Sequence, residues 1–132
     1  MATFKDYLEN KSPLILHGAL GTEIEALGYD ISGKLWSAKY LLEKPEVIQK
    51  IHETYVAAGA DLITTSSYQA TLPGLMEAGL TEKEAEQIIV LTVQLAKVAR
   101  DKVWGALDET EKAKRPYPLI SGDVGPYAAY LA

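Results

Sequence analysis

Two glycine-bearing corners and a run of hydroxyl groups carry the residues in this chain that are best suited to bind a ligand. In the first corner, HGALG, His17 precedes Gly18 and Gly21. Glycine permits sharp turns that leave main-chain N–H groups pointing into open space, where they can bind an anionic group. A tight turn that binds nothing has the same sequence requirements, so both interpretations stay open.

The hydroxyl groups lie in the segment TTSSY at 64–68, and the second corner, GDVGPY, spans 122–127. Hydroxyl groups at the end of a strand either fill space between elements or donate hydrogen bonds to a substrate, and the residues favour neither interpretation. Asp123 in the second corner can bind a ligand or stabilise the turn through an Asx interaction, and the turn is slightly favoured.

One aromatic and one imidazole side chain are the remaining candidates. Trp36 lies outside the expected helices and strands, and a large aromatic in a loop usually packs onto the core, so packing is favoured over stacking on a ligand. His52 lies beside the apolar stripe of a helix and has no partner four residues away. It is therefore interpreted as an ordinary histidine on the flank of a helix and not as a metal ligand.

Composition excludes several classes of function. The 132 residues carry a net charge of −5 without a basic stripe, so nucleic acid is not an expected partner. The polar amino terminus lacks the apolar segment of an export signal, and no aliphatic run is long enough to span a membrane. These features predict a soluble cytoplasmic protein without a membrane partner. The absence of cysteine excludes disulfides and thiolate catalysis within these residues.

The elements that would position these residues are three buried strands with helices between them. The strands are expected at 14–17, 61–67 and 118–121, where apolar or β-branched residues dominate. The helix signals are capping boxes at Thr22 with Glu25 and at Thr81 with Glu84, a Ser37 cap, a Pro45 start with a Gly59 stop, and stops at Gly28, Gly79 and Gly105. The charged run 108–115 is expected to form a loop or a last helical turn.

Strands joined by long helical crossovers must be parallel, and their polar corners then gather at one edge. This order is typical of an α/β fold, either a (β/α)8 TIM barrel or an open doubly wound sheet, and both bind ligands at the carboxyl ends of the strands. A complete barrel needs roughly 250 residues. If the fold is a barrel, residues 1–132 are the first three strand–helix units of a single barrel domain that is truncated. Its exposed strand edges could support self-association.

Four segments of the chain form a specific pattern: HGALGTEIEALG, LWSAKYLLEKPEVI, TTSSYQAT and DVGPYAAYLA. From Ile15 onward the chain resembles the amino-terminal part of the homocysteine S-methyltransferase family. The resemblance implies a barrel enzyme that transfers a methyl group from S-methylmethionine or S-adenosylmethionine to homocysteine, giving methionine. It also implies a zinc ion that is held by three cysteines and lowers the pKa of the homocysteine thiol. Those cysteines belong to later strands of the family, so no metal ligand or catalytic residue is expected in this chain.

The resemblance further implies which residues bind the substrate. Main-chain N–H groups of Gly18, Ala19 and Leu20 would meet the homocysteine carboxylate. The residues that would line the rest of the pocket are Thr65, Ser67, Tyr68, Gly125 and Tyr127.

Two positions depart from the family pattern. His17 stands where the family has an aspartate that would receive the substrate ammonium, and Asp123 stands where serine is common. Neutral imidazole accepts one hydrogen bond but supplies no counter-charge, and protonated imidazole would repel an ammonium. We therefore expect amino-acid binding to weaken below roughly pH 6.5, the unperturbed histidine value, unless another acidic group compensates. Asp123 adds a carboxylate near the mouth of the pocket.

Two other classes of function stay open at this point. The chain could be a non-catalytic binding or assembly module that pairs with a copy of itself or with a separate carboxy-terminal polypeptide. An unrelated barrel enzyme that binds phosphate at the glycine corners is less favoured, because the sequence has no GxxxxGK[ST] loop.

Overall fold

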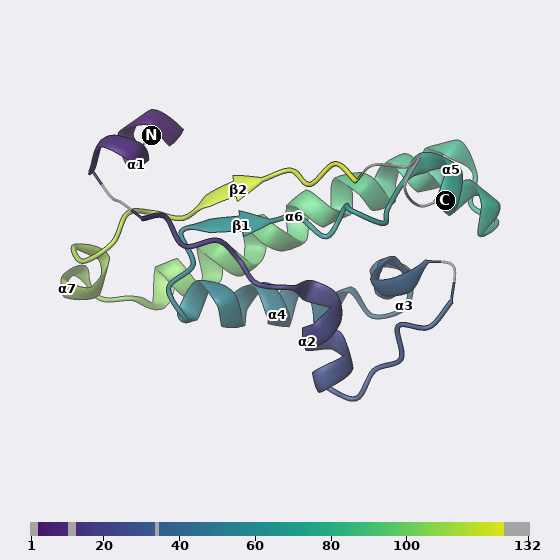
Figure 1. Cartoon of the computed structure of the whole chain (residues 1–132), viewed down its shortest axis with the longest axis horizontal. Coiled ribbons are helices and arrows are strands. Elements are labelled where there is room, and N and C mark those ends of the chain that lie inside the picture. The colour runs from purple at the N-terminus through teal and green to yellow at the C-terminus, as the bar shows by residue number, and fades with distance from the viewer. Residues whose placement is uncertain (1–2, 11–12, 34, 126–132) are drawn as a thin grey trace.

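The computed structural model describes residues 3–10, 13–33 and 35–125. Its elements in chain order are α1 (Phe4–Asn10), α2 (Leu20–Ala26), η1 (Trp36–Ala38), α3 (Lys39–Glu43), α4 (Pro45–Ala57), β1 (Leu62–Thr64), α5 (Leu72–Glu77), α6 (Glu82–Ala106), α7 (Glu109–Lys112) and β2 (Leu119–Ser121). The described part of the chain is therefore an α/β structure with a small sheet (Figure 1).

The sheet consists of β1 and β2, which pair in parallel with Leu62 opposite Leu119 and Thr64 opposite Ser121. The expected strand at 14–17 is reduced to a single parallel bridge, which joins Leu16 to Leu62 on the other edge of β1. The prediction of a full strand is wrong at this point, although the expected parallel direction is confirmed. Leu16 keeps 64% of its surface exposed because no described element packs over this edge.

Asp61 fixes the starts of these three segments relative to one another. Its buried carboxylate accepts a hydrogen bond from the main-chain N–H of Ile15 at 3.0 Å. Its own main-chain N–H donates to the Ile15 carbonyl, and its carbonyl accepts from the N–H of Leu119. One residue thus sets the register in which the exits of all three segments reach the same end of the sheet.

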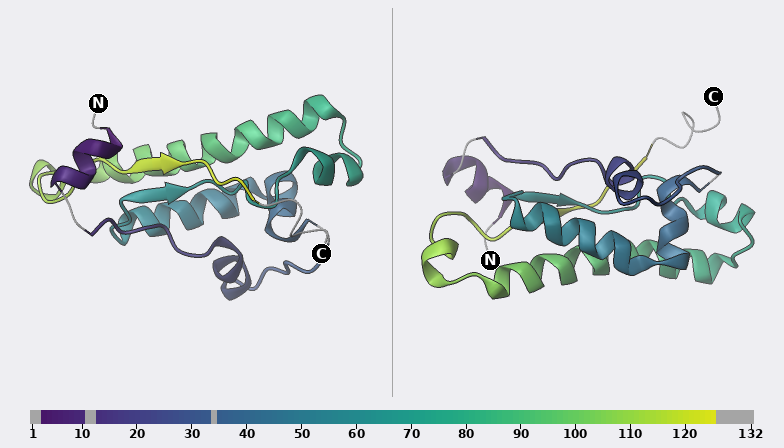
Figure 2. Two further views of the ribbon diagram at one scale, coloured as in Figure 1. Left: turned by 45° about the horizontal axis from the view of Figure 1, so that its top comes forward. Right: turned by 90° about the horizontal axis from the view of Figure 1, so that it is seen from below.

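The helices α4 and α6 lie together on one face of the sheet, as both views in Figure 2 show. Apolar side chains of α4, including Ile48 and Ile51, form a core cluster with Ala85 and Leu95 of α6. This arrangement buries the apolar stripe that the sequence predicts on each helix.

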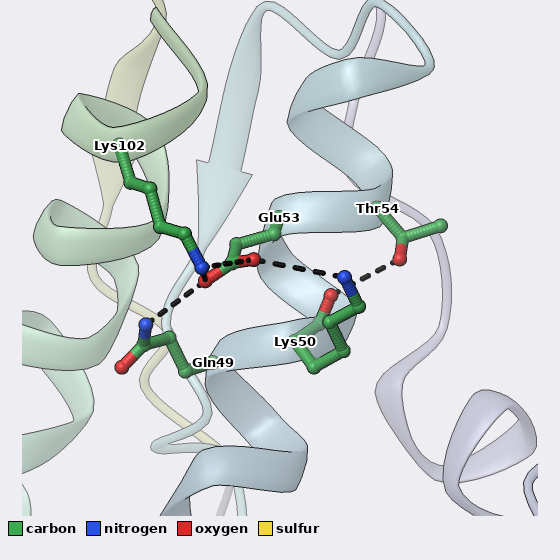
Figure 3. A network of polar contacts seen from close by, with 5 residues as sticks. All are labelled: Gln49, Lys50, Glu53, Thr54 and Lys102. Carbon is green, nitrogen blue, oxygen red and sulfur yellow. Dashed lines mark hydrogen bonds and ion pairs between the residues drawn. The ribbon is translucent and has the colours of Figure 1, made fainter. Parts of the chain in front are cut away.

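A polar network also connects α4 with α6 (Figure 3). Glu53, which is 7% exposed, accepts hydrogen bonds from Lys102 Nζ at 2.9 Å on both carboxylate oxygens. Gln49 donates a further hydrogen bond of 2.9 Å, and Lys50 lies 3.9 Å away. Burial alone would raise the pKa of the Glu53 carboxyl, but the hydrogen bonds from Gln49 and Lys102 and the lysine charges lower it overall.

The helix signals are confirmed at most positions. Helix α4 begins at Pro45 and is followed by Gly59 with a φ of 105°, and the capping box of Thr81 with Glu84 begins α6. The charged run contains one helical turn, α7, which Asp108 caps.

Three predicted helix signals are wrong. Gly105 lies inside α6, which continues to Ala106. Helix α2 begins at Leu20 with Ala19 as its N-cap and no side-chain cap, so Thr22 lies inside it. Ser37 lies within η1, where no side chain caps the turn.

Within the described ranges, no helix combines the length and apolar character needed to cross a bilayer.

Candidate functional site

A cavity of about 260 Å³ lies at the carboxyl ends of the three strand segments. Of the predicted site residues, it is lined by His17, Gly18, Ala19, Leu20, Thr65, Tyr68 and Asp123. The cavity is also lined by Trp36 and Ser66. We call this cavity the strand-end pocket. The expectation that the polar corners gather at one edge is therefore met by residues from all three segments.

Two of the predicted residues that the structure describes do not line this pocket. Ser67 and Gly125 lie on a neighbouring cavity of about 340 Å³, which shares Thr65 and Asp123 with the strand-end pocket. Tyr127 lies outside the described residues.

The hydroxyl groups of Thr65 and Ser67 bind the main chain of Asp123. Thr65 Oγ1 accepts a hydrogen bond from the Asp123 N–H at 2.9 Å, and Ser67 Oγ donates one to the Asp123 carbonyl at 2.5 Å. The two hydroxyl oxygens lie 2.7 Å apart. Because the Ser67 proton is used toward Asp123, Thr65 donates to Ser67. Of the two interpretations of this hydroxyl run, these two side chains therefore support the structural one: they hold the second corner against the exit of β1.

Ser66 differs from its two neighbours. It is 8% exposed, and its Oγ has no hydrogen-bond partner among the described residues although it lines the strand-end pocket. A buried hydroxyl without a partner costs free energy. The Oγ atom itself is buried, so no ligand contact is assigned to it. The sequence shows Ser66 in the hydroxyl run but gives no reason to single it out.

Glycine is required where the second corner approaches Tyr68. A Cβ atom at Gly125 would collide with the main-chain carbonyl oxygen of Tyr68, which is not free to move away. The bare backbone of Gly125 thus allows the second corner to lie directly against the segment that carries Tyr68.

His17 is hydrogen-bonded to His52. His52 Nδ1 lies 2.9 Å from His17 Nε2, and His52 is fully buried with no partner for its Nε2 among the described residues. The interpretation of His52 as an ordinary flank histidine is wrong, because helix α4 turns it toward the first corner. A lone histidine in an apolar stripe carries no sequence signal for this pairing.

Burial lowers the pKa of both histidines. For His17 the Gly18 backbone partly opposes this effect, whereas for His52 the nearby His17 adds to it and the pKa falls to about 3. Both rings are therefore neutral at pH 7.

Tyr55 of helix α4 packs against the first corner. Its ring lies 4.2 Å from the His17 ring, centroid to centroid, and its hydroxyl donates to the Ala19 carbonyl at 3.1 Å. A Cβ atom at Gly18 would overlap the Tyr55 ring. The sequence pattern assigns Tyr55 to the apolar stripe of α4 and does not predict this contact.

Trp36 lines the strand-end pocket and has an unfavourable backbone conformation. Its φ is 48°, and 52% of its surface is exposed. The interpretation that Trp36 packs onto the core is therefore wrong. Residues with a Cβ atom seldom adopt this left-handed conformation, and such outliers gather at functional sites.

No cluster of three His, Cys, Asp or Glu side chains that could hold a metal ion occurs in the described ranges. The sequence contains no cysteine, so these residues cannot form the three-thiolate zinc site that the resemblance implies.

Comparison with known proteins points to one family. A family model described as Homocysteine S-methyltransferase matches residues 14–132. The chain is 43% identical to homocysteine S-methyltransferase YbgG of Bacillus subtilis over 132 residues, which are all of this chain and 41% of that protein. It is 42% identical to homocysteine S-methyltransferase of Escherichia coli over 125 residues, 95% of this chain and 39% of that protein.

A solved structure is similar as well. The metallated form of the homocysteine methyltransferase MmuM from Escherichia coli superposes with a TM-score of 0.77 at 42% identity, covering 94% of this chain and 41% of that one. The chain thus spans about two fifths of the length of the relatives it matches. On the matched residues, the shared fold and the sequence identity, the chain belongs to the homocysteine S-methyltransferase family of methyltransferase enzymes.

Proposed function

We propose that the protein carrying this chain transfers a methyl group from a sulfonium donor, S-methylmethionine or S-adenosylmethionine, to homocysteine, and that this chain supplies its substrate-binding loops. The observation that carries the proposal is the strand-end pocket. Its lining includes residues from all four segments on which the family resemblance rests, and the chain belongs to this family. The (β/α)8 barrel is part of the same proposal, since two parallel strands and a bridged third segment fit its first units.

The first corner would bind the homocysteine carboxylate. Gly18, Ala19 and Leu20 line the pocket, and no side chain caps the first turn of α2. The first N–H groups of a helix lack partners within it, so they can donate to an anionic group that lies beyond the helix start.

Two aromatic rings would contact the donor. Trp36 and Tyr68 both line the pocket and remain 52% and 47% exposed. A cation is attracted to the face of an aromatic ring. A sulfonium group is such a cation, so these exposed rings have a reason to face the pocket that packing alone does not give.

The reaction needs alignment more than proton transfer. The homocysteine sulfur, as a thiolate, attacks the methyl carbon while the bond from that carbon to the donor sulfur breaks. The electron pair of the broken bond returns to the donor sulfur, which becomes a neutral thioether. The corner and the aromatic rings would hold the two sulfur atoms in line with the methyl group.

The zinc ion that the family resemblance implies would favour the thiolate form of homocysteine. The 132 residues hold no cysteine, so no step is assigned to the metal in this chain.

The test is methionine formation from L-homocysteine and each donor by the polypeptide expressed at the full length of its gene. Methionine production that Trp36→Ala and Tyr68→Ala reduce would support the proposal. A protein that binds neither homocysteine nor a sulfonium donor would overturn it, and would favour the alternative of an assembly module.

A further inference from the structure

The strand-end pocket contains one charged side chain among the described residues that line it, Asp123. The other side chains that line it are neutral and belong to 17–21, Ile31, Trp36, Ser37, 64–66, Tyr68 and Gln69. No hydrogen bond or ion pair joins the Asp123 carboxylate to any described residue. Within this part of the chain the pocket is thus negative, and its one charge is unpaired.

The backbone of Asp123 is fixed on both sides. Its N–H donates to Thr65 Oγ1 and its carbonyl accepts from Ser67 Oγ, at 2.9 and 2.5 Å. These bonds hold the residue against the exit of β1. A carboxylate on a restrained backbone is a preorganised acceptor for a ligand with N–H donors.

His17 does not compete for this role. Its Nε2 is hydrogen-bonded to His52 Nδ1 at 2.9 Å, and burial keeps both rings neutral at pH 7. His17 therefore adds neither a counter-charge for a cation nor a positive charge that would neutralise Asp123.

We propose that Asp123 binds the α-ammonium group of an amino-acid substrate and is the residue that selects for that group. The inference rests on the proposed function, in which both the acceptor and the donor can carry an α-ammonium. A contact with the reacting sulfonium is less suitable, because that charge disappears during the reaction. A carboxylate on it would stabilise the ground state more than the transition state and slow the transfer. The α-ammonium keeps its charge throughout, so binding it costs no rate.

The test compares substrates with and without the ammonium by calorimetric titration. The pairs are L-homocysteine with 4-mercaptobutanoate and S-methylmethionine with 4-(dimethylsulfonio)butanoate. A charge-assisted hydrogen bond predicts that Asp123→Asn weakens binding of the amino-bearing ligand by roughly 10- to 100-fold and leaves its deaminated partner within about twofold. The pair that shows this difference identifies whether the acceptor or the donor is bound.

Glu86→Gln is the matched control, because Glu86 is exposed on α6 and its loss changes the net charge equally. The restoring variant is His17→Asp combined with Asp123→Asn, which returns a carboxylate to the same pocket and should recover part of the lost affinity. Equal losses for both members of each pair, or no loss at all, would overturn the inference while leaving the proposed function intact. A wild-type protein that binds neither amino acid would overturn both.

Discussion

His17 at the first corner and His52 on α4 share a hydrogen bond of 2.9 Å between Nε2 and Nδ1, although 35 positions separate them in the chain. One ring must donate and the other accept, so the bond requires an unprotonated nitrogen. Because His52 is fully buried, a proton added to this pair would place a charge in the interior. Protonation of this pair is therefore unfavourable in the folded chain.

Stability should fall as pH decreases from 7.5 to 5.5. Burial, and then His17, lowers the pKa of His52 in the folded state to about 3 from an ordinary value of 6.5. The unfolded chain therefore binds protons in this range and the folded chain does not, which favours unfolding as the pH falls. From the His52 shift we expect a loss of about 1.4 kcal/mol in the free energy of unfolding, measured by urea denaturation at the two pH values.

His52→Asn is the matched variant, because its amide can replace Nδ1 toward His17 without titrating. The part of the pH dependence between pH 7.5 and 5.5 that His52 causes should disappear in this variant, and the part that the lowered pKa of His17 causes should remain. An unchanged slope would show that another group is responsible.

Homocysteine binding should be less sensitive to acid than it would be if His17 were an exposed histidine. Burial lowers the pKa of His17 below its ordinary value of 6.5. His17 therefore stays neutral further into the acid range, and its repulsion of the substrate ammonium should begin below roughly pH 6.5. Titrations of the wild type and of His17→Asp across pH 5 to 8 test this, and identical pH profiles for the two proteins would contradict it.

Removing Lys102 should destabilise the fold more than removing Lys50. Both lysine side chains are largely exposed and contact the buried Glu53, but Lys102 Nζ lies 2.9 Å from the carboxylate and Lys50 Nζ lies 3.9 Å away (Figure 3). Lys102→Met leaves the buried carboxylate with Gln49 and Lys50 only and should cost about 0.5–1 kcal/mol of unfolding free energy, because the lysine end of the pair is exposed to solvent. Lys50→Met should cost about 0.3 kcal/mol.

The same pair of variants gives a pH signature. The folded state lowers the pKa of Glu53 from its ordinary value of 4.5, so its contribution to stability is present above that value and lost as the pH falls through the lowered one. The difference between wild type and Lys102→Met should therefore shrink in acid below roughly pH 4.5. A difference that is constant down to pH 3 would mean that the ion pair does not stabilise the fold.

Two substitutions at Trp36 should separate its backbone cost from its role in binding. At a φ of 48° glycine is free of the strain that a Cβ atom causes. Trp36→Gly should therefore be about 1 kcal/mol more stable than Trp36→Ala. Both should weaken donor binding by roughly 2- to 30-fold, since each removes the same ring. Equal stabilities would indicate that the backbone is not strained, and unchanged donor affinity would remove Trp36 from the site.

The sequence predicts the helices of this fold well because their signals are local. Pro45 and the capping box of Thr81 with Glu84 act within one turn of the chain, and the structure confirms both. The first strand fails for the opposite reason. Its apolar run predicts burial on both faces, but burial depends on elements that pack over it, and Leu16 is 64% exposed.

The site shows the same division. The first corner and Asp123 are found from glycine spacing and family pattern, and the structure places both at one pocket. The roles of Thr65, Ser67 and His52 depend on partners 35 to 58 positions away in the chain. No local pattern reports such partners, so only the three-dimensional arrangement shows which hydroxyls hold the second corner.

The most direct test of substrate binding at the strand-end pocket uses the fluorescence emission of Trp36. The chain has two tryptophans, so Trp104→Phe leaves the one at the strand-end pocket as the sole tryptophan of these residues. We predict that S-methylmethionine, added together with L-homocysteine, changes the Trp36 emission saturably, and that 4-(dimethylsulfonio)butanoate with 4-mercaptobutanoate does so only at much higher concentration. Saturable binding by calorimetry without any change in Trp36 emission would contradict the account, because the substrates would then bind elsewhere.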